Sequence, residues 1–341
     1  MAKNKLTIGG LCSGVGGIEL GFKQAGFDIA WANDMDKNAM VTYESIIGEN
    51  HYIGGQAIKL ENIISNRKLS PQLTKVDVLA AGFPCQAFSV AGYRKGFDDD
   101  RGNVFFEIIR LINELKRKPK VLFLENVKNF KSHDKGRTFQ TVVNIIQDNG
   151  YSVFFDVLNT CDYTKIPQNR ERTFLICFRG EHNWEFSRKK NLVSREFAKR
   201  FPPKRVKSNK GIQDFLESGE VMENFYYRQD KYMYPELRKT MKSKDTLYQW
   251  RRQYVRENKN NRCPTLTANM GTGGHNVPLV LTDEGYRKLT PRECFNFQGF
   301  PKSFKLPKEM ANSHLYKQAG NAVSVPLISV LAKAIRESLN L

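Results

Sequence analysis

This chain of 341 residues lacks several features that mark membrane, extracellular and metal-binding proteins. Apolar residues nowhere run for the about 18 positions that a membrane helix needs. Glycines interrupt the start, MAKNKLTIGGLCSGVGG, before an apolar leader segment forms. The six cysteines are scattered, with no C-x-x-C pair and no histidine beside them at zinc-ligand spacing. We therefore expect a cytoplasmic protein with reduced cysteines, no membrane association and no metal site.

Acidic residues are also few, because 35 Asp and Glu stand against 54 Lys and Arg, which leaves a formal net charge of +19. The hydrophobic content of 40% and the aromatic content of 11% are typical of a folded globular protein. A protein this basic usually binds a polyanion, and nucleic acid is the first candidate. A basic surface without such a partner is the simpler alternative. The length allows two domains or one large one.

The first half of the chain alternates β-rich runs with segments of helical periodicity. Strands are predicted over residues 6–12, 28–34, 75–83, 120–127, 151–159 and 172–180. Helices are predicted over residues 17–26, 36–48, 103–118, 138–150 and 324–341. Strands that alternate with helices of this length indicate an α/β fold with a doubly wound, mostly parallel sheet.

The middle of the chain has a different character. Residues 188–210 contain ten Lys or Arg and one acid, Glu196, and the βα alternation stops until about residue 285. Aromatic residues alternate with cations in YYRQDKYMYPELRK and YQWRRQYVRENK. Cations pair with phosphates, and aromatic rings pack on sugars or bases, so this region favours a nucleic-acid-binding surface. A solvated basic surface is the alternative.

A glycine-rich turn, LCSGVGGIELGF, follows the first strand and opens a helix. In that position backbone N–H groups can approach a nucleotide-like ligand closely. Asp34 ends the second strand, twenty residues after Gly14, where an acid can accept hydrogen bonds from both ribose hydroxyls. The pattern predicts an adenosine-containing cofactor. A nicotinamide enzyme remains possible, although the turn lacks the full G-x-G-x-x-G spacing.

Reactive side chains stand at the predicted ends of two further strands. Cys85, in GFPCQAFSVAG, ends the fourth strand and Glu125, in LFLENV, ends the fifth. Ligands of open α/β sheets bind at the carboxyl ends of the strands, so the thiol and the carboxyl should converge on one crevice. Arg170 and Arg172 come just before the last strand, in PQNRER. Together these groups form a possible catalytic site, although Arg170 could also be a surface charge.

The chain resembles the DNA (cytosine-5)-methyltransferase family of bacterial modification enzymes. Six blocks carry the resemblance in the family's order: LCSGVGGIELGF, GFPCQAFSVAG, LENVKNF, PQNRERTFLICF, RKLTPRECFNFQGFP and KQAGNAVSVPL. The resemblance implies an S-adenosylmethionine-dependent methyltransferase fold over residues 1–183, completed by 315–341. It also implies a smaller, irregular target-recognition domain over 184–285, with a hinge segment at 286–314.

By this resemblance, the enzyme transfers the methyl group of S-adenosylmethionine to C5 of a cytosine flipped out of double-stranded DNA. Cys85 would add to C6 of the base as a thiolate, which turns the ring into an enamine. Glu125 would protonate or hydrogen-bond N3, and Arg172 would bind O2. The predicted catalytic residues are Cys85, Glu125, Arg170 and Arg172. Pro84 and Gly82 would hold the sulfur in place and allow close approach.

The resemblance also implies which residues bind S-adenosylmethionine. Asp34 is the ribose-binding acid, Met35 packs on adenine, and Asn321 closes the pocket from the C-terminal segment. The predicted cofactor-binding residues are Cys12, Ser13, Gly14, Gly16, Gly17, Asp34, Met35, Phe83, Pro84, Val104, Asn321 and Ala322. Three positions depart from the family: Gly10 and Gln56 stand where acids are common, and Cys12 stands where an aromatic residue is common.

Residues 92–102 match the family's mobile catalytic loop, and RCPTLTANMGTGGHN resembles its Thr-Leu element with a glycine loop. The predicted DNA-binding residues are Gln86, Ser89, Arg101, Arg251, Arg252, Arg256, Thr265 and Leu266. For each of the three middle arginines, a phosphate contact without sequence information is the alternative to base recognition. The expected partner is double-stranded DNA, a restriction endonuclease can act separately on the same site, and a monomer is the simplest state.

Three other functions stay open at this point. Relatives with the same six blocks methylate cytosine in tRNA, but the long basic middle is typical of a duplex-DNA enzyme. A catalytically silent nucleic-acid-binding module would not need Cys85, Glu125 and Arg172. A cysteine hydrolase that uses Cys85 with His133 would leave the glycine turn and the positive charge unexplained.

Overall fold

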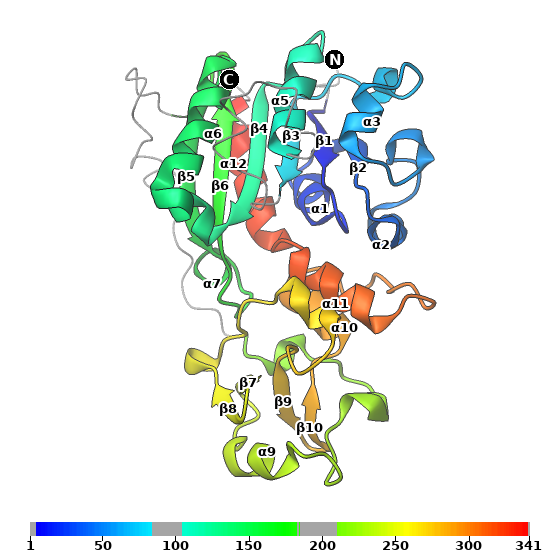
Figure 1. Ribbon diagram of the computed structural model, residues 1–341, viewed down its shortest axis with the longest axis vertical. Coiled ribbons are helices and arrows are strands. Elements are labelled where there is room, and N and C mark those ends of the chain that lie inside the picture. Colours follow the sequence, from blue (N-terminus) through cyan, green and yellow to red (C-terminus); the bar gives the residue numbers. More distant parts are fainter. Residues whose placement is uncertain (1–4, 84–103, 183, 185–209, 340–341) are drawn as a thin grey trace. The chain divides into compact units, whose positions relative to one another are not determined.

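The computed structural model of this chain describes residues 5–83, 104–182, 184 and 210–339 (Figure 1). The chain divides into two compact units. The first unit comprises residues 1–158, 171–203 and 328–341, and the second comprises residues 159–170 and 204–327. Within the described ranges, no helix is both long enough and apolar enough to span a lipid bilayer.

The first unit contains a six-stranded sheet with the order β2-β1-β3-β4-β6-β5. Its strands are β1 (Thr7–Leu11), β2 (Asp28–Asn33), β3 (Val78–Gly82), β4 (Val121–Val127), β5 (Ser152–Asn159) and β6 (Glu171–Phe178). Pairing is parallel from β2 through β1 and β3 to β4, and β6 then runs antiparallel to β4. The chain passes from β1 to β2 on one side of β1, and β3 pairs with the other side. The strand order therefore reverses at β1.

Helices cover both faces of this sheet (Figure 1). They are α1 (Gly17–Gln24), α2 (Lys37–Ile47), α3 (Leu60–Ile64), α5 (Val104–Glu114), α6 (Arg137–Asp148) and α12 (Val325–Leu339). Successive side chains of a strand face opposite sides, and β4 is apolar on both. Leu122 and Leu124 belong to the core under α3, α5 and α6, whereas Phe123 packs edge-on against Phe22 of α1 at 5.2 Å. This is the predicted α/β fold with a mainly parallel sheet.

One detail of the predicted strand order is wrong. The strand before Cys85 is β3, and the strand that carries Glu125 is β4, so they are the third and fourth along the chain rather than the fourth and fifth. Between β2 and β3 the chain forms two helices, α2 and α3, and two short 3₁₀ turns, η1 (Ile53–Gly55) and η2 (Ser70–Gln72). Glycine and proline in those turns leave no extended run that could add a strand.

The second unit contains a four-stranded sheet with the order β10-β9-β7-β8, in which the paired strands are antiparallel. Its strands are β7 (Tyr248–Arg251), β8 (Tyr254–Glu257), β9 (Leu279–Thr282) and β10 (Gly285–Lys288). Its helices are α7 (Thr160–Tyr163), α9 (Tyr234–Thr240), α10 (Pro291–Phe297) and α11 (Asn312–Asn321). The sequence predicted an irregular region here, because strands of four residues are too short to show a period-2 pattern.

The remaining short turns of 3₁₀ helix are η3 (Lys128–Gly136), η4 (Gln213–Phe215), η5 (Glu223–Phe225), η6 (Lys259–Asn261) and η7 (Ala268–Thr272). A small core holds α9 on the sheet of the second unit through Met233, Leu237, Tyr248 and Leu279. Helix α10 starts with a capping box, in which the Thr290 hydroxyl accepts from the Glu293 backbone N–H and the Glu293 side chain accepts from that of Thr290.

Candidate functional site

The glycine turn after β1 has the form that a nucleotide-like ligand needs. Cys12, Gly14 and Gly16 all have positive φ values, of 51°, 53° and 79°, so the chain reverses sharply before α1. A Cβ atom at Gly16 would lie 2.8 Å from the Tyr43 ring, and only glycine fits there. A Cβ atom at Gly14 would have no heavy atom within 4 Å. The turn is therefore packed at Gly16 and open at Gly14.

Asp34 joins this turn to the end of β2. One oxygen of its carboxylate accepts a hydrogen bond from the backbone N–H of Gly14 at 2.8 Å, and the other accepts from that of Asp36 at 2.9 Å. Burial raises the pKa of Asp34, and these two backbone hydrogen bonds oppose the rise. Each oxygen keeps further lone pairs for a ligand hydroxyl. Met35 follows on the surface, with 68% of its area exposed.

The other predicted residues of the turn lie where the sequence places them. Ser13 holds the turn against β2, since its backbone N–H donates to the Asn33 carbonyl at 3.0 Å. Gly17 is the first residue of α1 and is buried. Burial, with smaller contributions from Asp34 and Glu19, raises the pKa of the Cys12 thiol to about 12. Cys12 is therefore a neutral thiol at physiological pH and not a nucleophile.

Glu125 lies at the carboxyl end of β4, opposite Gly82 in the parallel register of β3. A Cβ atom at Gly82 would lie 3.5 Å from Glu125 Oε2 and 3.8 Å from Ile18 Cδ1 of α1. The end of β3 therefore lies between the Glu125 carboxyl and the helix that follows the glycine turn. Within the first unit, the predicted catalytic acid and the predicted cofactor turn are close to the same strand end.

Arg172 of β6 forms an ion pair with Glu125, with Nε 3.0 Å from Oε1. The two side chains are only 14% and 11% exposed. They come together because β6 runs antiparallel to β4, with Arg172 opposite Val127 at the end of the strand. A largely buried guanidinium in this position orients the carboxyl and is itself held by it. Its Nη1 also donates to the Glu171 carbonyl at 2.9 Å.

Asn126, which follows Glu125 in the LENVKNF block, is a further site residue for which the sequence predicts no role of its own. Its side-chain amide donates to the Phe83 carbonyl at 3.0 Å, and its side chain is buried. The hydrogen bond holds the backbone immediately before Pro84. The Phe83 ring packs between Phe105 and Phe130, with centroids 5.8 and 5.6 Å away. Any contact of Phe83 with a cofactor is therefore left to its backbone.

Several predicted residues lie outside the described ranges: Cys85, Pro84, Gln86, Ser89 and Arg101. The basic run at 188–210 is also outside them except for Lys210. Val104, predicted at the cofactor, is the first residue of α5. Asn321 ends α11 with its side chain exposed, and Ala322 follows it. Both of these belong to the second unit.

Arg170 is buried inside the second unit, which differs from the catalytic role predicted for it. Its guanidinium donates to three backbone carbonyls, those of Leu266, Gly320 and Ala322, at 2.5 to 3.1 Å. Only 1% of the residue is exposed. These contacts tie the segment before β6 to the glycine loop and to the end of α11. The structure therefore gives Arg170 a structural role, and of the two arginines only Arg172 reaches Glu125.

Thr265 and Leu266 have a similar role within the second unit. The Thr265 hydroxyl donates to the Asn169 carbonyl at 2.6 Å, and the Leu266 side chain is 1% exposed. The buried Leu266 side chain does not present a surface to DNA, contrary to the prediction. The parallel bridge between Gln168 and Cys263 lies beside them. The Thr-Leu element thus pairs with the PQNR segment as part of the scaffold.

The three middle arginines lie on the exposed hairpin of β7 and β8. Arg252 occupies the turn with a φ of 55°, and Arg251 and Arg256 flank it on the two strands. Gln249 accepts a hydrogen bond from Arg256 Nη2 at 2.5 Å and a weaker one from Arg251 at 3.4 Å. All three guanidinium groups are on the surface. Their contact with phosphates or base edges stays a prediction.

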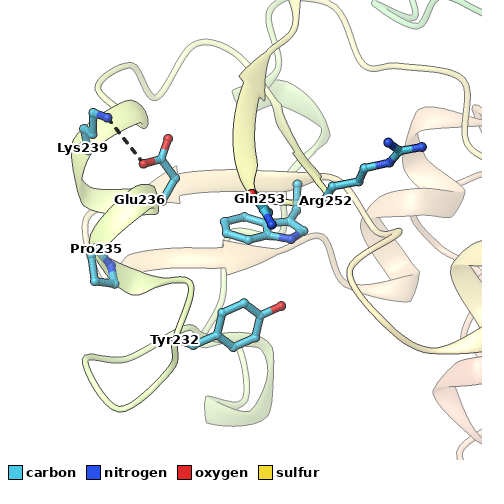
Figure 2. A pocket seen from close by; sticks show the side chains of 7 residues that line it. Tyr232, Pro235, Glu236, Lys239, Arg252 and Gln253 are labelled. Atoms are coloured by element: carbon cyan, nitrogen blue, oxygen red, sulfur yellow. Dashed lines mark ion pairs between the residues drawn. The ribbon is translucent and has the colours of Figure 1, made fainter.

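Beside this hairpin the second unit has a shallow pocket of about 340 Å³. Figure 2 shows its lining and the Arg252 side chain that extends away from the aromatic rings. Tyr232 is 72% exposed and meets Trp250 edge-on at 5.9 Å between centroids. His275 lies 6.1 Å from Trp250 and 5.7 Å from Tyr232. Exposed rings beside cations are a common way to contact nucleic acid.

Comparison with known proteins places these features in a family. Residues 6–337 match the family described as C-5 cytosine-specific DNA methylase. The Type II methyltransferase M.Bsp6I of Bacillus sp. (strain RFL6) is 50% identical, over 98% of this chain and 99% of that protein. The Type II methyltransferase M.HhaI of Haemophilus parahaemolyticus is 36% identical, over 97% of this chain and 94% of that protein.

Among solved structures, the chain is similar in fold to the Dnmt2 methyltransferase of S. pombe. That comparison has a TM-score of 0.74 at 18% identity, covering 99% of this chain and 100% of the other. The predicted resemblance is confirmed by the sequence comparisons, which extend over nearly the whole chain. The chain belongs to the C-5 cytosine-specific DNA methylase family.

Proposed function

We propose that this chain is the modification enzyme of a Type II restriction–modification system, and that it methylates one cytosine in a short duplex sequence through a covalent bond from Cys85. Membership of the family means that it transfers the methyl group of S-adenosylmethionine to C5 of cytosine in DNA. The observation that supports the catalytic assignment is the Glu125–Arg172 pair beside Gly82, three positions before Cys85.

The first unit fits S-adenosylmethionine. The turn is open at Gly14, and the carboxylate of Asp34 has lone pairs left for two ribose hydroxyls. Exposed Met35 is available to pack on adenine. When bound, the cofactor supplies an activated methyl group on a sulfonium centre, so that no metal has to activate the donor.

The residues of the chain activate the acceptor. Cytosine C5 is a weak nucleophile, and addition of the Cys85 thiolate to C6 would shift the C5–C6 electron pair toward C5. Glu125 would protonate or hydrogen-bond N3, so that negative charge does not accumulate on the ring. Arg172, held beside Glu125, would bind O2 and keep the carboxyl oriented. After C5 takes the methyl group, loss of the C5 proton to a base lets the thiolate leave.

The target base cannot react inside a duplex, and it would therefore be flipped out. We assign sequence recognition to the second unit, on the exposed arginines of its β7–β8 hairpin and the rings beside them. One asymmetric protein surface is enough to recognise a short DNA site, and we therefore propose that the chain acts as a monomer. A cognate endonuclease would act on the same site separately.

The assignment is tested by bisulfite sequencing of DNA from a methylation-free host that expresses the chain. We predict protection of cytosines in a single short sequence context. The Cys85→Ser variant should give no protection, since an alcohol at neutral pH does not add to C6 as a thiolate does. DNA binding by the variant, measured by fluorescence anisotropy, should be close to that of the wild type.

The outcomes separate the possibilities. Protection by the variant at the wild-type rate would disprove the covalent mechanism. Absence of protection with the wild type, while the folded protein binds S-adenosylhomocysteine, would point to another substrate such as tRNA. Protection scattered over all contexts would refute recognition of a short specific site.

A further inference from the structure

In the first unit, the Glu19 side chain fills the space beside Gly10. Gly10 lies in β1, and Glu19 lies in the first turn of α1. A Cβ atom at Gly10 would lie 1.8 Å from Glu19 Oε1 and 2.7 Å from Ser13 Oγ. The Glu19 carboxyl therefore fills the space that any side chain at position 10 would need. Strand β1 itself offers no acid at position 10, so the carboxyl beside this part of the strand comes from the neighbouring helix.

The Glu19 carboxyl is buried without a compensating positive charge among the described residues. The residue is 1% exposed, and its Oε2 atom has no hydrogen-bond partner there. Burial is the main cause that raises the pKa of Glu19 to about 7. The Ser13 hydroxyl lowers this pKa, and the nearby Asp34 charge raises it. The other titratable groups that face it are Cys12, Tyr43 and Tyr52, all of which are neutral at physiological pH.

A buried acid with an acid for a neighbour is a costly arrangement in a protein that lacks a ligand. It becomes favourable when a cation binds beside it. Glu19 lies beneath the glycine turn, with Ser13 beside it and Asp34 close enough to affect its pKa. The turn itself is open at Gly14. The cation would therefore belong to the ligand of this turn.

We propose that Glu19 supplies, from α1, the carboxylate that β1 lacks at Gly10, and that it binds the ammonium group of S-adenosylmethionine. The ammonium group has three N–H donors and a full charge, which complement a buried carboxylate. The sulfonium centre has no donor, and the ribose hydroxyls are assigned to Asp34. This inference rests on the cofactor of the proposed function but not on the role of Cys85.

The test compares two ligands that share the adenosine thioether. S-Adenosylhomocysteine has the amino-acid group, and 5′-methylthioadenosine lacks it. In isothermal titration calorimetry, Glu19→Gln should weaken S-adenosylhomocysteine binding roughly 10-fold to 100-fold, the effect of one charged hydrogen bond. It should leave methylthioadenosine binding unchanged. Asp34→Asn should weaken both ligands, and Glu49→Gln, on the surface, should weaken neither.

Binding should also release protons. With a pKa raised to about 7, the Glu19 carboxyl is partly protonated in the free protein near neutral pH, and the ammonium group would ionise it. Titrations in two buffers of different ionisation enthalpy should therefore show a larger proton release at pH 6 than Glu19→Gln does, and this difference should shrink as the pH rises above 7. In Glu19→Gln this release should disappear, while any contribution of Asp34 remains.

A charge relocation distinguishes recognition from structure. Gly10→Asp combined with Glu19→Ala places the acid on β1 and removes the nearest obstructing side chain, which leaves only the Ser13 hydroxyl to rotate aside. This double variant should bind S-adenosylhomocysteine more tightly than Glu19→Ala alone, with no matching gain for methylthioadenosine.

Equal losses for the two ligands in Glu19→Gln, or no loss, would overturn the role of Glu19 and leave the proposed function intact. If the wild type bound neither ligand, both the inference and the proposed function would be overturned. Melting temperatures of the ligand-free variants identify any loss that comes from unfolding.

Discussion

At the scale of single residues, the site depends on charges whose partners come from other elements. Glu125 is oriented by Arg172 of the adjacent strand, and Asn126 anchors the backbone before Pro84. Arg170, two positions from Arg172, binds backbone carbonyls of the second unit instead. Two arginines of one short motif thus have unrelated roles, because the chain passes from one unit to the other between them.

Glu19 leads to a prediction for the ligand-free protein. Its folded pKa of about 7 lies above the usual 4.5, so the folded state binds more protons than the unfolded state between those values. Its contribution to stability is present at low pH and is lost as the pH rises from about 4.5 through 7. Glu19→Gln should therefore raise the free energy of unfolding at pH 8 by up to about 3 kcal/mol, with little change near pH 4.5. Urea denaturation at both pH values measures this, and an equal effect at both would contradict it.

At the scale of elements, close backbone packing decides the second unit. Helix α11 lies directly on η7, and a Cβ atom at Gly320 would be 2.2 to 2.5 Å from backbone atoms of Thr267 and Ala268. The Gly320 carbonyl also accepts from Arg170. The glycine of the AGNAV block therefore allows one helix to approach another segment, a role separate from the cofactor contact predicted for the neighbouring Asn321.

Gly320→Ala should lower the unfolding free energy by roughly 1–3 kcal/mol. The obstructing atoms belong to the backbone of Thr267 and Ala268 and cannot move aside without distorting the start of η7. The matched control is Gly219→Ala, at a position with no heavy atom within 4 Å of the added Cβ. Thermal melts of both variants measure the difference. A Gly320→Ala variant as stable as the control would show that α11 can shift at little cost.

At the scale of the whole molecule, charge governs the encounter with DNA. The net charge of +19 is spread over a chain whose described cations include the exposed arginines of the β7–β8 hairpin. Neutralisation of phosphates releases counterions, and the affinity of such a protein depends strongly on salt. Loss of a cation that contacts only a phosphate reduces the salt dependence of binding. Loss of a cation that recognises a base reduces the preference for the cognate site.

The association constant for duplex DNA should fall steeply with salt, with a log–log slope of about −0.9 for each phosphate neutralised. Arg256→Ala should reduce the magnitude of this slope by about one if that side chain contacts a phosphate. A loss of discrimination between cognate and altered sites, with an unchanged slope, would instead assign Arg256 to a base. Anisotropy titrations at several salt concentrations supply both numbers, and an association constant independent of salt would refute binding through charge.

Much of the first unit was predictable because its signals are local. Each predicted strand and helix of that unit has a counterpart in the described structure, since burial on both faces makes the strands apolar and α6 repeats its buried residues at helical spacing. The antiparallel sheet of the second unit was missed, because strands of four residues carry too little pattern. The buried roles of Arg170 and Leu266 were missed because their partners are about 100 to 150 positions away.

By itself, the sequence determined the α/β class, the glycine turn, the acid at the end of β2 and the six blocks that identify the family. These depend on periodicity and on residues close together in the chain. Only the tertiary structure decided that Arg172 rather than Arg170 meets Glu125, that Asn126 holds Phe83, and that Glu19 fills the space at Gly10. The physical reason is that a side chain's charge and burial are set by the atoms across the strand or helix from it, and those atoms come from distant parts of the chain.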